Sequence, residues 1–491
     1  MSITRIVALR VRFKWNGADW VDETARVLAI NGALEYQALH EAMASGKHII
    51  QQATIRLANK DHRYSTWHTA SVLYPYRTTG GPYQAPCEIA MSVDGNPYQI
   101  VFTGYVKSPT ENYIKNDVSF TIWDKGEILR KKYSTAMLQN YMEHDVVIYY
   151  LQLAGLVDGV DFISPTYASV NGGTATIDYA STRIPYSWLD DEPIWDELAD
   201  LAQASGAQVY VTRDGFVCFR KGYQWATIGA QETVTPDQYN DIEPRFDDKS
   251  FYDEVLVEYA ERVPGDASDE LWKLDRPLLI YPSTTEEIEA KLRYPAITIT
   301  PPVANTDYFV RNLAGQDKIA SITLVLTYAA QKVVIRATNN TGEMAILSKM
   351  SIKGQPLLGQ PSKQTKGSTG SDNYDREISV RGNPYIQSQV QAEGVKNFLT
   401  WWYKTVKMLW KIKGIRGVPT RALGDRITFK IEGQTLYGIT TRIEWTIGSI
   451  ESGGAFGYQQ SLDLVEDVFT GEGTFFKVGV SQLGGGDGVW F

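Results

Sequence analysis

The chain has 491 residues, too many for one hydrophobic core, so a prior of about 150 residues per domain predicts three or four domains. Its formal net charge of −9 argues against a protein that grips nucleic acid through the phosphates, because such binding needs a basic face. No run approaches about 18 apolar residues and residues 1–12 alternate in polarity, so we expect no membrane span, no signal peptide and synthesis in a cytoplasm.

Composition narrows the fold class further. Aromatic residues make up 12% of the chain, which favours pleated, half-buried surfaces and protein interfaces. The two cysteines, Cys87 and Cys218, lie far apart, and Cys218 falls within an alternating strand pattern. We therefore interpret Cys218 as a small buried hydrophobe and expect no functional disulfide.

Residues 1–133 predict a mostly antiparallel barrel or sandwich. Residues 7–15 alternate as a half-buried strand, and 94–97 (Asp-Gly-Asn-Pro) give a strong hairpin signal. Two polar segments follow the first strand, and in the second of them Asx turns can end a strand. Their main residues are Asp22 and Thr24 in the first segment and Leu57, Asn59, Asp61, Tyr64 and Ser65 in the second.

Residues 134–245 predict an α+β unit. We expect a helix over 134–156 and a second helix after Asp190 and Asp191, which look like N-cap residues. Gly206 stands where that helix would end in the left-handed region. Asp214-Gly215 then predicts a hairpin between strands at 208–212 and 216–220.

The remaining segments predict a second barrel interrupted by an insertion. Strand patterns at 252–260 and 376–380 flank residues 269–370, where an Asn/Gly turn separates two strands. Ser388 and Gln391 have the form of a capping box, opening a long helix through Val406 that Gly414 and Gly417 would end. Leu423-Gly424-Asp425 precedes a strand at 426–431, followed by strands at 436–445 and 458–465.

In this order the segments resemble the minor tail and baseplate-hub proteins of tailed bacteriophages. The resemblance rests on the two N-terminal segments, with Glu23 in place of the usual apolar residue, on the helix and hairpin near 206–215, and on two later motifs. The residues that carry these last three matches are Gly206, Asp214, Gly215, Asn340, Gly342, Gly354, Leu423, Gly424 and Asp425.

The resemblance implies a mainly β (α+β) chain with two tail-tube-like β-barrels. The first barrel would span 1–133 and the discontinuous second barrel 246–268 and 371–468. The other implied units are an α+β hub domain at 134–245, an inserted Ig-like β-sandwich at 269–370 and a Gly-rich extension at 469–491.

The implied function is structural, without enzymatic activity, metal or cofactor. A homotrimer at the virion's tail tip would form a six-barrel ring that continues the tail tube around the tape-measure protein and, transiently, DNA. The implied partners are a distal tail or tail tube protein, the tape-measure protein and receptor-binding or tail fibre proteins. Assembly in the host cytoplasm without stable membrane insertion is expected.

Two other functions stay open. One is a tail adhesin that binds host surface glycans through the insertion or the Gly-rich end. The other is a cell-wall-degrading enzyme that uses an acidic cluster, although acids in a first helical turn more simply complement the helix dipole. That cluster comprises Asp190, Asp191, Glu192, Asp196, Glu197 and Asp200. The five histidines show no paired-ligand spacing.

Overall fold

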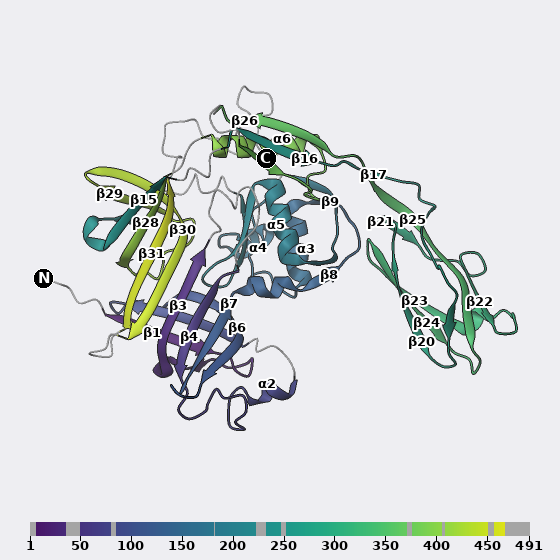
Figure 1. Cartoon of the computed structure of the whole chain (residues 1–491), viewed down its shortest axis with the longest axis horizontal. Coiled ribbons are helices and arrows are strands. Elements are labelled where there is room, and N and C mark those ends of the chain that lie inside the picture. The colour runs from purple at the N-terminus through teal and green to yellow at the C-terminus, as the bar shows by residue number, and fades with distance from the viewer. Residues whose placement is uncertain are drawn as a thin grey trace.

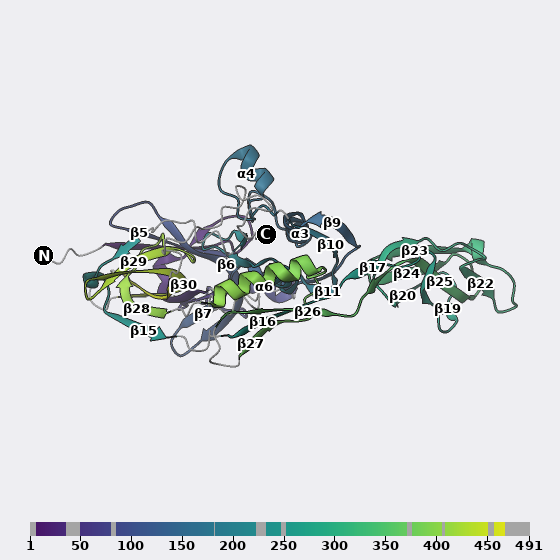
Figure 2. The same cartoon turned by 90° about the horizontal axis from the view of Figure 1, so that it is seen from above.

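The structure is a computed structural model that describes residues 6–35, 50–79, 85–180, 182–221, 232–246, 252–370, 376–404, 408–449 and 456–466. It is mostly β. A broad body carries one long arm, which the inserted residues form (Figures 1 and 2). The predicted Gly-rich extension at 469–491 lies outside the described residues.

One 13-stranded sheet dominates the body and contains strands from both predicted barrels. In Figure 1 its yellow C-terminal strands lie directly beside its purple N-terminal strands. In order along the sheet they are β15 (Asp241–Phe246), β28 (Met408–Arg416), β31 (Phe456–Glu466), β30 (Gln434–Ser449), β3 (Val27–Glu35), β4 (Gln52–Ala58), β7 (Asp117–Trp123), β6 (Gln99–Asn112), β5 (Pro86–Val93), β1 (Val7–Phe13) and β2 (Val21–Asp22). Beside β30 the sheet adds β29 (Arg426–Ile431) and β14 (Glu232–Val234).

This sheet corrects the expectation of two closed barrels. None of the sheets among the described residues closes on itself, and the two predicted barrels are joined where β3 pairs with β30. Buried residues of both halves also form one hydrophobic core, in which Phe102 contacts Trp445. Alternating polarity identified several of these strands, such as β1, β29 and β31, but it carries no signal for pairing between strands about 400 residues apart in sequence.

The α+β unit contains α3 (Glu143–Leu153), α4 (Pro165–Asn171), α5 (Ile194–Ser205) and the hairpin of β12 (Ala207–Val211) and β13 (Val217–Lys221). Gly206 adopts the left-handed conformation at the end of α5 (φ 63°), as predicted. The predicted helix over 134–156 is wrong in its first half. There β8 (Lys132–Ser134) pairs with β11 (Asp190–Pro193), and β9 (Leu138–Met142) pairs with β10 (Arg183–Ser187).

The N-cap interpretation of Asp190 and Asp191 is wrong as well. Both residues belong to β11, and the N-cap position of α5 is Pro193, which offers no side-chain acceptor. Strand pairing with β8 therefore takes precedence over helix capping at these two residues.

A three-stranded sheet of β26 (Lys363–Ser368), β16 (Glu254–Tyr259) and β27 (Glu377–Val380) supports α6 (Gln389–Tyr403). Strand β16, predicted to open the second barrel, thus belongs to a separate sheet. The Ser388 hydroxyl accepts from the Gln391 N–H at 3.2 Å, which confirms the predicted N-cap.

Helix α6 is shorter than predicted. Its last residue is Tyr403, and β28 begins at Met408, so Gly414 lies inside a strand rather than at a helix end. Val406 lies outside the described residues. Residues 408–416 are strand because β15 and β31 pair with them on both sides, and neither partner is close in sequence.

The arm consists of two packed layers of strands. Its extent differs from the predicted insertion at 269–370, because residues 363–368 form β26 of the sheet under α6. One layer is built on β25 (Ala345–Gly359), which pairs with β17 (Arg262–Pro264), β18 (Asp269–Lys273), β19 (Leu278–Ile280), β21 (Ala296–Thr300) and β22 (Tyr308–Asn312). The other layer is β20 (Thr285–Lys291), β24 (Lys332–Asn339) and β23 (Ile322–Tyr328). Side chains of both layers share one core. The Asn/Gly turn after β24 connects the two layers and does not form a hairpin.

Candidate functional site

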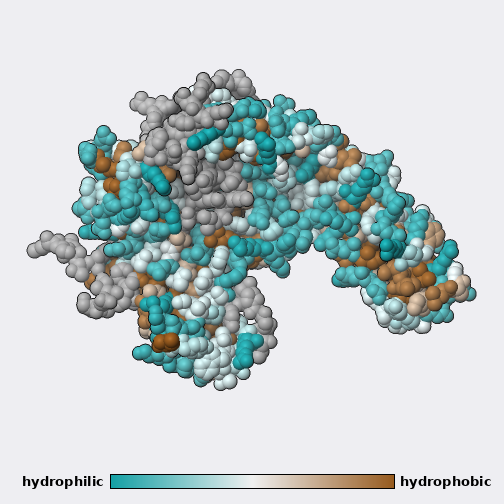
Figure 3. Space-filling model, viewed as in Figure 1, coloured by the Kyte–Doolittle hydropathy of each residue, from teal (hydrophilic) through white to brown (hydrophobic). Residues whose placement is uncertain are grey.

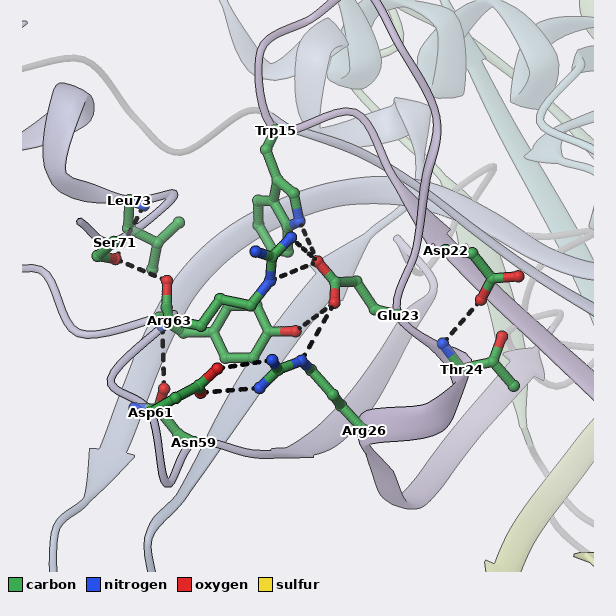
Figure 4. A network of polar contacts seen from close by, with 11 residues as sticks. Trp15, Asp22, Glu23, Thr24, Arg26, Asn59, Asp61, Arg63, Ser71 and Leu73 are labelled. Carbon is green, nitrogen blue, oxygen red and sulfur yellow. Dashed lines mark hydrogen bonds and ion pairs between the residues drawn. The ribbon is translucent and has the colours of Figure 1, made fainter.

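The first predicted motif is organised around a buried carboxylate, Glu23 (Figure 4). The Trp15 indole N–H and the Arg63 guanidinium donate to one oxygen, at 2.9 and 2.8 Å, and the Tyr64 hydroxyl donates to the other at 2.8 Å. Glu23 is only 3% exposed, and burying a charge is costly unless donors compensate it. Burial, followed by the nearby Glu23, raises the pKa of Tyr64.

Asp22, Thr24 and Asp61 fasten the surrounding backbone. Asp22 accepts from the Thr24 N–H at 2.9 Å, and the Thr24 hydroxyl accepts from the Val11 N–H of β1 at 2.9 Å. Asp61 receives two hydrogen bonds from the Arg26 guanidinium, at 2.8 and 2.6 Å. Those bonds lower the pKa of Asp61 to about 2.

Asn59 and Ser65 form an adjoining cluster with Glu111. The Asn59 amide donates to the Ser65 hydroxyl at 3.1 Å and to Glu111 at 2.9 Å, and its carbonyl accepts from the Tyr64 N–H at 2.9 Å. Leu57 is fully buried on β4. Side chains around Glu23, Asn59 and Asp61 thus hold the segment after β4 and are here called the clamp. Asp22 and Thr24 bind the backbone beside the clamp, and Leu57 lies in the core.

Sequence reasoning missed the residues at the centre of this clamp. The sequence motif predicts an apolar residue where Glu23 stands, and it assigns no role to Arg63 or Glu111. The available signal was an acid at a position where burial was expected, because a buried acid requires donors nearby.

Two further motifs that are 200 residues apart meet at a pocket of about 360 Å³. Asp214 on the β12–β13 hairpin and the Leu423-Gly424-Asp425 loop both line it. The Arg213 guanidinium bridges them by donating to the carbonyls of Pro419 (2.8 Å) and Arg421 (3.1 Å). Gly424 adopts a φ of 81° and donates to the Thr440 carbonyl at 2.8 Å.

The pocket's charged groups are largely engaged with the protein itself. Asp425 accepts from the Ala422 N–H at 2.6 Å, and burial raises its pKa to about 6. Gly215 ends the hairpin turn with a φ of 87° and packs against Thr103 of β6. We interpret the pocket as the joint between the α+β unit and the main sheet.

The acidic cluster is divided between two elements, β11 and α5. Asp190 and Asp191 lie on β11, whereas Glu197 faces inward from α5 and accepts a hydrogen bond from the Tyr385 hydroxyl. Burial raises the pKa of Glu197 to about 7. Among the described residues, no group of three or more His, Cys, Asp and Glu side chains could hold a metal ion.

The remaining predicted residues have structural contacts. Gly206 lies against Phe398 of α6. Asn340 donates to the Thr323 hydroxyl at 2.9 Å, and Gly342 follows in the same turn. A Cβ at Gly354 would lie 2.1 Å from the Thr298 carbonyl oxygen, so this position on β25 requires glycine for close strand approach.

One face of the main sheet carries polar side chains and is here called the polar face. It spans eight successive antiparallel strands, β15, β28, β31, β30, β3, β4, β7 and β6. On the six strands from β31 to β6, one row of neighbouring residues is uncharged and exposed or half-buried: Gln459, Thr446, Asn31, Thr54, Thr121 and Ser108. The adjacent row points into the core and includes Ile447, Ile30, Ile55 and Phe120.

Two basic residues of the polar face, Arg442 and Lys413, form ion pairs with carboxylates of the same or a neighbouring strand. Arg442 of β30 contacts Glu444 at 2.5 Å and Asp463 of β31 at 3.9 Å. Lys413 of β28 forms ion pairs with Asp241 and Glu243 of β15. The face therefore carries charges of both signs that neutralise one another locally.

Both cysteines are free and buried. No described helix is long and apolar enough to cross a membrane.

No protein-family model matches the chain, and no curated protein matches it in sequence. Three solved structures that do match are tail proteins, the class that the sequence motifs resemble. A tail protein from Neisseria meningitidis MC58 has a TM-score of 0.47 and 10% identity, over 94% of this chain and 96% of the other. The 43 kDa tail protein of prophage MuSo2 from Shewanella oneidensis has a TM-score of 0.47 and 9% identity, over 93% and 98%. Prophage tail protein gp18 from Listeria monocytogenes EGD-e has a TM-score of 0.36 and 8% identity, over 93% and 94%.

Proposed function

We propose that this protein is a structural hub of a bacteriophage tail tip, in which three copies form a ring around a channel. The polar face is the observation that carries the proposal. A channel wall must be wetted by water along its whole width, and eight neighbouring strands here present exposed or half-buried polar side chains while their other face is core.

The joining of the two chain halves supports the same function. Residues 1–133 contribute β3, β4, β7 and β6 to the polar face, and segments flanking the insertion contribute β15, β28, β31 and β30. Each subunit thus supplies two groups of four strands, so three subunits supply six such groups around a ring. In this proposal a sixfold tube continues into a threefold tip, and neighbouring subunits cover the open ends of each sheet.

The electrostatics fit a channel that passes DNA without holding it. Affinity for DNA comes largely from unpaired Lys and Arg that neutralise phosphates, and it falls as these residues find other partners. Arg442 and Lys413 already have carboxylate partners on the polar face. The tape-measure protein would fill the channel before ejection, and DNA would pass through it afterwards.

The α+β unit of α3, α4, α5, β12 and β13 and the sheet under α6 would brace the ring wall, and the arm formed by β17 to β25 would project from it. A distal tail or tail tube protein would stack on the ring. Receptor-binding or tail fibre proteins would attach outside it.

The first test is the mass and shape of the full-length protein. Light scattering at several concentrations is expected to give three chains of 55.0 kDa, and electron microscopy a ring with the polar face lining its channel. A monomer whose mass is independent of concentration, together with a failure to assemble on purified tail tubes, would overturn the proposal. A ring with the polar face outward would do the same.

A second candidate function, binding of host surface glycans, is favoured by one exposed aromatic group. Trp67 and Tyr113 are 47% and 59% exposed and their rings lie 6.4 Å apart, with His62 beside Trp67. Exposed aromatic faces can stack on sugar rings. Loss of host-cell binding in Trp67→Ala, with the ring mass unchanged, would support this function, and equal binding by both proteins would reject it.

A further inference from the structure

Strand β23 is an uncharged edge strand on the arm. Its sequence is Ile-Thr-Leu-Val-Leu-Thr-Tyr, and it pairs with β24 on one side only. No other described strand pairs with its outer side. Val325 is 52% and Tyr328 38% exposed. In Figure 2 β23 and β20 lie along opposite sides of the arm, and Figure 3 shows hydrophobic residues gathered over the arm's outer half.

The opposite edge of the same sheet is protected by charge. Strand β20 reads Thr-Glu-Glu-Ile-Glu-Ala-Lys, and charged side chains on an edge strand oppose pairing with another chain. Strand β23 has no such protection, no proline and no bulge in its pairing with β24. The two edges therefore differ in the property that decides whether a further strand can add.

The hydrogen-bond pattern shows which groups β23 offers. The Ser321 carbonyl accepts from the Asn340 N–H at 3.1 Å, and the Ala329 N–H donates to the Lys332 carbonyl at 2.8 Å. Because bonding direction alternates along an antiparallel strand, residues 323, 325 and 327 bond to β24. The N–H and C=O groups of Ile322, Leu324, Leu326 and Tyr328 then point to the open edge.

We propose that β23 pairs with β23 of a second copy of this chain, antiparallel and about a two-fold axis through Val325. In that register Leu324 faces Leu326 of the other copy and Ile322 faces Tyr328, so all outward-pointing backbone groups meet partners. On the solvent side Thr323 faces Thr327 and Val325 faces itself. Apolar residues meet apolar residues, and threonine meets threonine.

The charges on the two edge strands favour pairing of a second copy at β23 over pairing at β20. A two-fold pairing of β23 brings no charged residue opposite another, whereas the same pairing of β20 would place Glu287 opposite Glu289, which is destabilising. The nearest charge on the solvent side, Arg336 opposite Val325 on β24, is already paired with Glu287 at 2.7 Å. A second copy thus fits the β23 edge without electrostatic cost.

The contact is small, since seven residues bury less than the roughly 1,200 Å² of a standard stable interface. It therefore links copies weakly and in a concentration-dependent manner. It does not rest on the proposed ring, because it needs only the arm and applies equally to a monomer or a trimer.

The test is disulfide trapping in the full-length protein. The native cysteines Cys87 and Cys218 are buried, so an introduced cysteine is the accessible thiol. In the proposed register the Cα atoms of two Val325→Cys residues lie about 4.5 Å apart, within the range of a disulfide. Two Thr327→Cys residues would lie about 13 Å apart along the strands, which no disulfide can span.

Under mild oxidation V325C is expected to give at least about tenfold more crosslinked dimer than the matched control T327C, because only V325C meets the geometric limit of about 7 Å. A mixture of T323C with T327C should crosslink as V325C does. Equal or lower yield for V325C than for T327C would overturn the proposal. V325K should also lower the mass measured by light scattering at high concentration, and an unchanged mass would count against it.

Discussion

Gly32 of β3 lies directly opposite Trp445 of β30, at the junction where the N-terminal and C-terminal parts of the sheet meet. A Cβ at Gly32 would lie 2.4 Å from the indole ring of Trp445, which occupies the space that a side chain would need. The bare glycine backbone therefore lets a large aromatic side chain cover the junction.

Gly32→Ala is expected to destabilise this junction by about 1–3 kcal/mol, the usual cost of overpacking a well-filled core. Amide hydrogen exchange should quicken in β3 and β30 more than in β1 and β5. Asn31→Ala, on the polar face next to it, should stay within about 0.5 kcal/mol. If the double variant Gly32→Ala/Trp445→Leu loses as much unfolding free energy as the two single variants added together, the contact between Gly32 and Trp445 does not cause the destabilisation.

Glu23→Gln should loosen the clamp after β4 because two arginines, Arg26 and Arg63, lose a carboxylate in a buried setting. We expect a loss of about 2 kcal/mol in the local free energy of unfolding, read from hydrogen exchange over residues 57–73. Asp61→Asn removes an exposed ion pair with the same Arg26 and should cost less than about 1 kcal/mol. Equal costs would show that burial of Glu23 is irrelevant.

Glu197 should give the protein a pH-dependent stability. Its folded pKa of about 7 exceeds the ordinary 4.5 because of burial, so the folded state binds the proton more tightly than the unfolded state. Stability is then highest below about pH 4.5 and falls as pH rises to about 7, by up to about 3 kcal/mol.

Glu197→Gln should remove that fall, which is measured as the difference in unfolding free energy between variant and wild type from pH 4.5 to 7.5. The buried Asp124, whose pKa burial also raises to about 7, is present in both proteins and cancels. Asp196→Asn, exposed in the first turn of the same helix, is the control and should leave the profile unchanged. If the difference in unfolding free energy between Glu197→Gln and wild type does not change between pH 4.5 and 7.5, Glu197 is not the group that causes the pH dependence.

Glu444→Gln should increase DNA binding, because it removes the carboxylate that the Arg442 guanidinium of the polar face contacts at 2.5 Å. Fluorescence anisotropy with duplex DNA is expected to show tighter binding at low salt and a salt dependence that is steeper by up to about one released counterion. Glu287→Gln frees Arg336 on the arm instead, outside the polar face, and serves as the matched control. The same gain in both variants would argue against a special role for this face.

Local features were predictable from the sequence. The Ser388 cap, the left-handed Gly206 and the hairpin at Asp214-Gly215 each depend on residues within a few positions of one another. Two strands of the insertion, β24 and β25, followed from the Asn/Gly turn between them, whereas the sandwich was only implied by the resemblance to tail proteins. In each case the side chain that decides the conformation is part of the same short segment.

Pairing between distant segments was not predictable. The β3–β30 junction, the end of α6 before β28 and the strands β8 and β9 all depend on partners far away in sequence. The same limit hid the meeting of the hairpin at Asp214 with the loop at Asp425, and the carboxylate of Glu23 among its donors. Alternating polarity along a strand predicts that one of its faces is buried, but it does not predict which segment packs against that face.

The chain enters and leaves the arm at almost the same point. Strand β17 leads in beside the end of β25, and Gly265 donates a hydrogen bond to the Pro356 carbonyl at 2.8 Å. An inserted unit whose two ends already touch can be lengthened, shortened or exchanged without moving the ends it is joined to. The sequence and length of the arm can therefore change during evolution without altering the structure of the body.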